Sequence, residues 1–550
     1  MNPAPTLPDL LHRHATTTPH APALTHLRAT RADTLNFAQV AAEVTATANA
    51  LAAAGITVGT RTVLMTRGAR EFVVTFYALL TLGAVTVLID PGLDRRAVRR
   101  CLDETAPHAL VGEPAAHLAQ RVLRWASASI RIKVSTSQSR LGPWETVTSL
   151  RAAAPRPAPA ACADQAPALI AFTSGSTGIP KGVVYTGRQL VLQSRQVATA
   201  FGIRQSTAAL CAFLPFTLYL PALGAHAVIP PFDPRRPAAA DPARLHAAIT
   251  RTGASVLFGA PALLTVLARH CTRRGITLRT VTDVASFGAP LPSGLLTLLD
   301  RCLPADARIR SVYGATECLP AAIAERSDLR RRAAGDPALP GRLIGTPIDP
   351  VRVRIVPVDL PPTAEWNEAL ALPARTVGEI TVCGEHVSRT YYGRPEAITA
   401  AKIRHDGSTI HRTGDLGWID EDGGLWYCGR KAHTVTTAAG ALYTEHIEPH
   451  CDRLPGVRRS ALVGLGPPGR QEAVLCVQPD DARADPAGLL AAVRTGLDQL
   501  AGGPLVRQVL IHPRLPVDIR HNSKIDRDRL AAWAGRRLPA RNHRPPGGER

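Results

Sequence analysis

Hydroxyl residues and glycines crowd into the stretch FTSGSTGIPKG, residues 172–182, around a single lysine. Glycine-rich turns let backbone N–H groups close around an anion, and hydroxyl side chains add further donors. Lys181 contributes a positive charge as well. The stretch therefore predicts a phosphate cradle, whose members are Thr173, Ser174, Gly175, Ser176, Thr177, Gly178 and Lys181.

This cradle differs from the P-loop of strand-to-helix nucleoside triphosphatases, whose lysine follows a glycine and precedes serine or threonine. Here the lysine follows Pro180 and precedes Gly182. The alternative interpretation is an ordinary hydroxyl-rich surface loop, which the particular order T-S-G-S-T-G-x-P-K-G disfavours. We therefore expect a nucleotide-binding loop of another kind.

A second motif, YGATE, follows the expected strand RIRSV and comprises Tyr313, Gly314, Ala315, Thr316 and Glu317. Open α/β sheets bind their ligands at the carboxyl ends of strands, which is where this motif lies. A tyrosine there can stack on a nucleotide base, and the carboxylate of Glu317 is a hard oxygen ligand suited to Mg²⁺. The motif predicts a base and metal site.

Two further stretches supply a carboxylate and a guanidinium. HRTGDLGWID contains Asp415, which is suited to the hydroxyl groups of a ribose, and GRKAHTV contains Arg430. Near the C-terminus, PVDIRHNSKIDR contains Lys524.

Lysine occurs at only five positions in the chain, namely Lys133, Lys181, Lys402, Lys431 and Lys524. Because arginine serves for nearly every other positive charge, a retained lysine suggests a need for its compact ammonium group, and three of the five fall in these motifs.

The elements that must position these residues follow an α/β pattern. Between about residues 35 and 425, short β-branched strands alternate with alanine- and leucine-rich helical stretches, which is typical of mainly parallel sheets. Strands are expected at 84–89, 169–172, 255–258, 285–287 and 309–313. A smaller β-rich region begins at 378 and ends in a hairpin over 416–430.

After Arg430 the pattern restarts with strands at 461–465, 472–477 and 506–512 and a helix at 486–500, enough for a separate α+β lobe. We expect an N-terminal domain over 1–429, a C-terminal domain over 430–537 and a disordered basic tail over 538–550. GLGPPG at 464–469 matches a dinucleotide-binding fingerprint, but its prolines and the strand that follows predict a simple turn.

Composition excludes several classes of protein. The uncharged run at 72–89 is long enough to cross a membrane, but Gly83 predicts a helix followed by a strand instead. No N-terminal secretory signal is evident, so a cytoplasmic protein is expected. The ten cysteines are scattered singly, which predicts reduced core residues rather than disulfides or zinc ligands. The net charge of +20 lacks the clustering and aromatic residues that nucleic-acid binding requires.

With all five motifs in this order, the chain resembles the adenylate-forming superfamily of acyl-CoA synthetases, peptide-synthetase adenylation domains and luciferases. The resemblance implies an α/β fold: a large domain of two α/β sheets plus a distorted β-barrel, and a small mobile α+β lobe that swings about a hinge after Arg430. It implies ATP and Mg²⁺ as cofactors. By the same resemblance, residues 173–181 bind the ATP phosphates, Gly288, Ala289, Pro290 and Tyr313 flank adenine, Asp415 and Arg430 hold the ribose, Glu317 binds Mg²⁺, and Lys524, Glu317 and Thr177 are catalytic.

Other stretches are similar to the β-lactone synthetases of bacterial olefin biosynthesis. They are VLIDPGLDRRAVRRCLDE at 87–104, FLPFTLYLPALG at 213–224, YGATECLP, GRKAHTV with LYTEHIEP, and PVDIRHNSKI. This similarity implies a long-chain 3-hydroxy fatty acid substrate, whose own hydroxyl group closes a four-membered ring and expels AMP. No nucleic acid and no membrane span are expected from the composition above, and the similarity leaves open association with other enzymes of the same lipid pathway.

Two departures bear on the acceptor. Where thioester-forming members commonly have aspartate or lysine two residues after the arginine, this chain has Ala432, and AAGALYTEHIEP at 438–449 replaces their glycine-rich tunnel stretch. The alternative function is a fatty acyl-CoA or acyl-carrier-protein ligase. From another class, the chain could be a catalytically silent adenylate-binding partner, which the joint presence of Lys181, Glu317 and Lys524 disfavours. No residue identifies the base for ring closure: Tyr219, His226 and His433 lie near the motifs, but a packing or surface role fits each of them better. The apolar residues at 213–223 fit either an acyl pocket or plain core.

Overall fold

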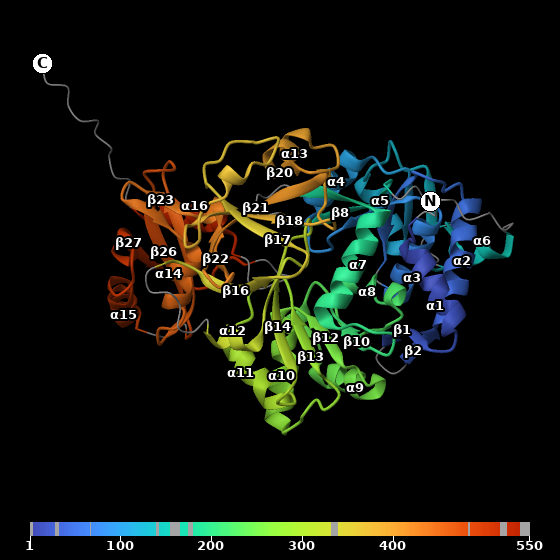
Figure 1. Cartoon of the computed structure of the whole chain (residues 1–550), viewed down its shortest axis with the longest axis horizontal. Helices are drawn as coiled ribbons and strands as arrows, with labels where there is room; N and C mark the ends of the chain where they lie inside the picture. The colour runs from blue at the N-terminus through green and yellow to red at the C-terminus, as the bar shows by residue number, and fades with distance from the viewer. Residues whose placement is uncertain are drawn as a thin grey trace, which may run out of the picture.

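Two large sheets with helices between them form most of the molecule (Figure 1). The structure is a computed structural model, and it describes residues 4–27, 32–66, 68–138, 142, 144–153, 165–173, 180–331, 339–481, 485–517 and 525–538. The largest hydrophobic core joins the facing sides of both sheets through α1 (Leu7–Thr17), α2 (Phe37–Ala53), α3 (Ala69–Thr81) and α7 (Gly187–Phe201). The expected α/β class is confirmed.

The smaller sheet has eight strands and carries the predicted phosphate cradle at the end of β8. Along the sheet the strands are β19 (Thr390–Tyr391), β9 (Lys181–Thr186), β8 (Pro167–Thr173), β4 (Val85–Ile89), β3 (Arg61–Met65), β5 (Ala109–Gly112), β6 (Ile132–Ser135) and β7 (Glu145–Thr146). Outside it lie α4 (Arg95–Thr105) and α5 (Pro114–Leu123), where Arg99 donates a hydrogen bond to the Leu123 carbonyl. A short α6 (Val147–Ala153) packs on α2.

The apolar run at 72–89 is divided as predicted. Helix α3 ends before Gly83, whose φ of +66° is left-handed, and β4 follows as a buried strand. Within the described ranges, no helix combines the length and apolar character that crossing a bilayer requires. The nine cysteines that the structure describes are unpaired, and eight of them are buried, in agreement with the expected reduced core residues.

The larger sheet has fourteen strands. Its parallel part consists of β14 (Arg308–Tyr313), β13 (Asp283–Ser286), β12 (Val256–Gly259), β10 (Ala208–Cys211), β11 (His226–Ile229) and β1 (Pro22–Leu27), with β2 (Ala32–Asn36) antiparallel at the edge. Helices α9 (Pro242–Thr252), α10 (Pro261–Arg274) and α11 (Ser293–Cys302) cover its outer face. Short helices α8 (Leu214–Thr217) and α12 (Arg326–Arg331) lie in its connections.

Beyond β14 the larger sheet continues through antiparallel strands. They are β15 (Ala322–Ala324), β16 (Arg342–Pro347), β22 (Leu425–Arg430), β21 (Ser408–Ile419), β18 (Gly378–Cys383) and β17 (Arg352–Val356), while β20 (Lys402–His405) pairs with β21 after α13 (Pro395–Ala401). The resemblance predicted a separate distorted barrel here. Because β16 pairs with both β15 and β22, these strands extend the sheet, and no closed barrel forms among the described residues.

The chain after β22 has its own core. β25 (Val457–Leu465), β26 (Glu472–Pro479) and β27 (Val506–Ile511) form a sheet, packed with α14 (Thr444–Cys451), α15 (Pro486–Asp498) and α16 (Arg527–Gly535), and β23 (Val435–Thr437) with β24 (Gly440–Leu442) forms a hairpin. The stretch at 464–469 ends β25 in a turn, as expected. Arg342 of β16 and Glu445 of α14 form an ion pair at 3.0 Å across to the large sheet.

Candidate active site

Three of the predicted nucleotide-binding residues form one connected group. The Tyr313 hydroxyl donates to Oδ2 of Asp415 at 2.7 Å, and Nε of Arg430 lies 2.9 Å from Oδ1 of the same carboxylate. Asp415 is buried, while the Arg430 side chain is 30% exposed. Burial, reinforced by the Asp415 charge, raises the pKa of Tyr313 well above its usual value, so this hydroxyl stays a donor.

Strand pairing explains why these residues meet. Asp415 and Arg430 are opposite one another on the antiparallel strands β21 and β22. Cross-strand partners bring their side chains together on one face. Tyr313 ends β14, and its ring centroid lies 6.4 Å from that of Tyr427 on β22. The end of the parallel sheet therefore faces the hairpin that the sequence predicted.

The segment Gly288, Ala289 and Pro290 leaves the sheet beside the strand that ends in Tyr313. It follows β13, which pairs in parallel with β14 in the register Ser286 to Ser311, so both segments leave the same edge of the sheet. Gly288 has a φ of +86°, a left-handed conformation that favours glycine. Gly314, Ala315 and Thr316 continue from Tyr313, and the Tyr185 hydroxyl donates to the Thr316 carbonyl, which holds this segment against β9.

The predicted phosphate cradle is described only at its two ends. Thr173 ends β8 and pairs with Lys181 at the start of β9, so the residues between them connect adjacent antiparallel strands. The predicted donors Ser174, Gly175, Ser176, Thr177 and Gly178 lie outside the described residues, as does Lys524. Helix α7 follows β9 directly and is capped by Thr186 with Gln189.

Glu317 lies in a polar cluster that the motif alone did not predict. The Tyr391 hydroxyl donates to its Oε1 at 2.6 Å. Burial opposes ionisation of Glu317, but the positive charge of Lys402 and this hydrogen bond outweigh it, so the pKa of the carboxyl group is lowered. Glu317 is therefore an anion at neutral pH.

Two basic residues face each other in the same cluster. Lys402 on β20 and His411 on β21 are direct cross-strand partners, and both are buried. Burial lowers the pKa of Lys402 to about 8, and burial together with Lys402 lowers that of His411 to about 3. His411 is therefore neutral at pH 7, and Lys402 carries most of the positive charge.

Sequence reasoning missed Tyr391, Lys402 and His411 as site residues. One signal was available, since Lys402 is among the five lysines of an arginine-rich chain, and the other two had none. The structure also places the candidates considered for ring closure. Tyr219 donates to Gln193 in the core, and His226 bonds Thr25 at 2.7 Å, so both are occupied in packing. Burial lowers the pKa of His433, which lies just after Arg430, to about 4.

The stretch at 213–223 is mostly core. Phe216, Leu218, Leu220 and Ala222 are buried, and Phe213 stacks at 5.0 Å on Phe287, the residue before Gly288. The apolar cluster therefore borders the predicted adenine segment while it fills the interior.

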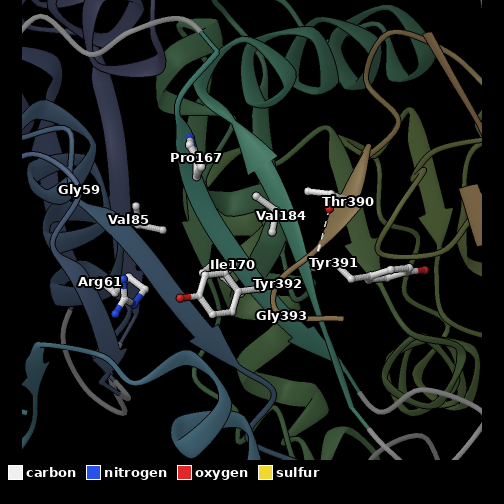
Figure 2. Close-up of a pocket in the computed structure, with 10 residues that line it drawn as sticks. All are labelled: Gly59, Arg61, Val85, Pro167, Ile170, Val184, Thr390, Tyr391, Tyr392 and Gly393. Carbon is white, nitrogen blue, oxygen red and sulfur yellow. Dashed lines mark hydrogen bonds between the residues drawn. The ribbon is translucent and has the colours of Figure 1, made fainter. Parts of the chain in front are cut away.

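A cavity of about 440 Å³ lies elsewhere, over the amino ends of strands β3, β4 and β8 (Figure 2). Arg61 and Tyr392 border it, with the guanidinium 5.8 Å from the ring centroid. Figure 2 shows consecutive Tyr391 and Tyr392 pointing in opposite directions, with the Tyr391 hydroxyl turned away from Arg61. Because Thr173, Tyr313 and Gly288 leave the carboxyl ends of their strands, this cavity is separate from the predicted nucleotide site.

The donor chemistry fits a magnesium ion held jointly with a nucleotide. No group of three or more histidine, cysteine or carboxylate side chains able to hold a metal occurs in the described ranges. Mg²⁺ characteristically uses one or two carboxylates together with substrate phosphates, and the ionised Glu317 supplies one.

Known proteins resemble this chain over most of its length. A family model described as AMP-binding enzyme matches residues 11–392. The chain is 47% identical to an olefin beta-lactone synthetase of Stenotrophomonas maltophilia strain K279a, over 92% of each chain, and 44% identical to one of Xanthomonas campestris pv. campestris, over 91% of each. ATP-bound MatB from Rhodopseudomonas palustris shares the fold, with a TM-score of 0.77 at 23% identity over 96% of this chain and 98% of that one.

Proposed function

We propose, because this chain belongs to the AMP-binding enzyme family, that it is an ATP-dependent, AMP-forming ligase that makes a β-lactone. It activates a long-chain 3-hydroxy fatty acid as an acyl adenylate and then closes the ring, releasing pyrophosphate and AMP. The observation that carries this proposal is the identity of 47% and 44% with two olefin beta-lactone synthetases over more than nine tenths of the chain.

The nucleoside part of ATP binds where the parallel sheet meets the β21–β22 hairpin. Gly288, Ala289 and Pro290 border adenine on one side, and the Tyr313 ring borders it on the other side. Asp415 accepts hydrogen bonds from the ribose hydroxyls, while Arg430 balances its charge at 2.9 Å. The Tyr313 hydrogen bond supports this assignment because it orients the carboxylate before the ribose arrives.

We assign the ATP phosphates to the segment from Thr173 to Lys181, whose residue types offer hydroxyl and backbone donors, and within it we assign a catalytic role to Thr177. Glu317 would hold Mg²⁺ together with the phosphate oxygens. When bound, Mg²⁺ stabilises negative charge on the departing pyrophosphate. Lys181 adds a fixed positive charge beside the same anions.

Adenylation joins two anions, since the substrate carboxylate attacks the α-phosphate of ATP. A bond forms between a carboxylate oxygen and the α-phosphorus, and the bond from that phosphorus to the bridging oxygen breaks, so that pyrophosphate leaves with the electron pair. Lys524, brought in by the lobe that follows Arg430, neutralises the carboxylate and the α-phosphate oxygens. This step requires the C-terminal lobe, residues 430–537, to rotate on a hinge after Arg430 against the domain formed by residues 1–429.

Ring closure uses the substrate's own nucleophile. The 3-hydroxyl oxygen attacks the acyl carbon, a C–O bond forms, AMP leaves with the acyl–oxygen bond pair, and the hydroxyl proton passes to a base or solvent. An intramolecular attack gains effective concentration, so a tunnel for a second substrate is unnecessary. The departures at Ala432 and 438–449 from thioester-forming members support this acceptor.

The proposal predicts a defined product pattern. Purified enzyme with a long-chain 3-hydroxy acid, ATP and Mg²⁺ should release AMP and form a β-lactone without CoA, as measured by nucleotide chromatography and mass spectrometry. The matched acid without the 3-hydroxyl group should be adenylated but should give no lactone. Strict dependence on CoA, with an acyl-CoA product, would instead support the ligase alternative. We also propose that the enzyme acts in the cytoplasm, where ATP is supplied, beside the enzymes that make its hydroxy acid.

A further inference from the structure

Glu317 has more polar and charged neighbours than a metal-binding carboxylate requires. Tyr391 is 3% exposed and donates its hydroxyl to Oε1 of Glu317 at 2.6 Å. Two ammonium groups approach the same tyrosine ring: Nζ of Lys402 lies 5.0 Å from the centroid and Nζ of Lys181 lies 5.3 Å from it. Aromatic faces attract cations at such distances, most strongly where water is excluded. The ring is therefore held by electrostatics as well as by packing.

Lys402 also fixes the backbone beside the carboxylate. Its ammonium group donates to the Ser388 carbonyl at 2.6 Å. The Ser388 N–H in turn donates to the Glu317 carbonyl at 2.8 Å, and the Ser388 hydroxyl donates to Val184 of β9 at 3.0 Å. Lys402 is thus connected to Glu317 through two sets of contacts. One runs through the Tyr391 ring to the Glu317 side chain, and the other runs through Ser388 to the Glu317 main chain.

A buried lysine at this position lowers the stability of the fold unless other groups compensate for its lost hydration. Lys402 is 7% exposed, and a buried ammonium group loses its hydration, which only well-placed partners offset. Its partners are a carbonyl oxygen, an aromatic face and the nearby Glu317 charge. Nearly all other basic side chains in the sequence are arginines. A planar guanidinium would not fit the enclosed contacts that the compact ammonium group of Lys402 makes.

We propose that Tyr391 and Lys402 are positioning residues that hold the Glu317 carboxylate in the orientation that binds Mg²⁺·ATP. This inference rests on the proposed function only in the identity of the ligand. Partners of this kind commonly change metal affinity when they are removed, although they never touch the metal. A simple charge effect predicts the reverse, because deleting a positive charge next to a cation site would strengthen cation binding.

Binding measurements with the full-length protein distinguish the positioning role from a simple charge effect. We would titrate Mg²⁺ into protein saturated with a non-hydrolysable ATP analogue, using calorimetry and the Mg²⁺-dependent rise in melting temperature. Tyr391→Phe, which removes one oxygen, and Lys402→Met should each weaken Mg²⁺ binding by about 10- to 100-fold. Lys402→Arg should not restore it. Lys133→Met, the loss of a lysine on β6 at the far end of the smaller sheet, should bind like the wild type.

Each outcome decides the inference. Unchanged or tighter Mg²⁺ binding in a folded Lys402→Met variant overturns it, as does a lower melting temperature without a change in Mg²⁺ binding. If Lys402→Met does not fold, Tyr391→Phe alone carries the test. No acid substrate is present, so the result does not depend on lactone formation. A wild-type protein that binds Mg²⁺ with the analogue but makes no lactone would contradict the proposed reaction and leave this inference standing.

Discussion

The phenolic hydroxyl of Tyr313 donates a 2.7 Å hydrogen bond to Asp415, which lies 102 residues further along the chain. The same carboxylate pairs with Arg430 across two strands. One carboxylate therefore links the end of the parallel sheet to the strand from which the C-terminal lobe departs. The proposed ribose site and the strand that leads into the C-terminal lobe therefore share this contact.

Asp415→Asn should lower kcat/KM for ATP by a larger free energy than it lowers the free energy of unfolding. The change removes the charge that partners Arg430 and weakens an acceptor proposed for the ribose, so kcat/KM for ATP should fall about 10- to 100-fold, the range for a charged hydrogen bond. Pyrophosphate exchange measures it. Tyr313→Phe, which removes only the orienting hydroxyl, should cost several-fold less. Equal losses in both variants would contradict the ribose assignment.

Lys524→Ala should slow adenylation by about 10² to 10³, the effect of removing one preorganised charge-stabilising donor. Pyrophosphate exchange with a 3-hydroxy acid measures this step directly, and Lys133→Ala is the matched control. Thermal unfolding should be unchanged. A rate within a few-fold of the wild type would show that the C-terminal lysine does not reach the nucleotide.

The buried Glu379 should be important for stability. It accepts from Arg412 at 2.7 Å and from Lys431 at 3.3 Å, and its own side chain is 6% exposed. Glu379→Gln leaves the Arg412 charge buried without its partner, which should lower the free energy of unfolding by about 3–5 kcal/mol. Urea unfolding measures the change.

An exposed ion pair nearby is the control. Arg404 and Glu365 lie 3.1 Å apart with side chains 75% and 78% exposed. Glu365→Gln should change the free energy of unfolding by less than about 1 kcal/mol, because exposed pairs are screened by water. Similar effects in the two variants would mean that burial does not govern the stability of these pairs.

His386 should make the protein less stable in mild acid. Burial lowers the pKa of His386 from 6.5 to about 4. Between these values the unfolded chain binds a proton at this side chain and the folded chain does not, so the free energy of unfolding falls as the pH is lowered through that window. The loss is at most about 3–4 kcal/mol, since each pKa unit corresponds to about 1.4 kcal/mol.

His386→Gln should therefore flatten the dependence of stability on pH between 6.5 and 4, measured by urea unfolding at several pH values. His20→Gln, at an exposed position, serves as the comparison and should leave the slope unchanged. Parallel slopes for the wild type and His386→Gln would contradict the buried, neutral histidine.

Much of the fold could be predicted because its signals are local. Short β-branched runs became β4, β8, β12, β13 and β14 within a few residues of the expected bounds. The glycine at 83 divided an apolar run that length alone would assign to a membrane. The site motifs were recognisable for the same reason, since each is a contiguous group of residues in the sequence.

The sequence by itself determined which elements form, that the chain is an α/β protein, and which contiguous motifs are candidates for binding the nucleotide. Only the tertiary structure decided that β16 joins β15 to β22 and keeps the sheet open, and that Tyr391, Lys402 and His411 gather around Glu317. These residues come from separate strands and belong to no shared motif. Their proximity depends on strand order and register, which arise from long-range pairing that no local pattern specifies.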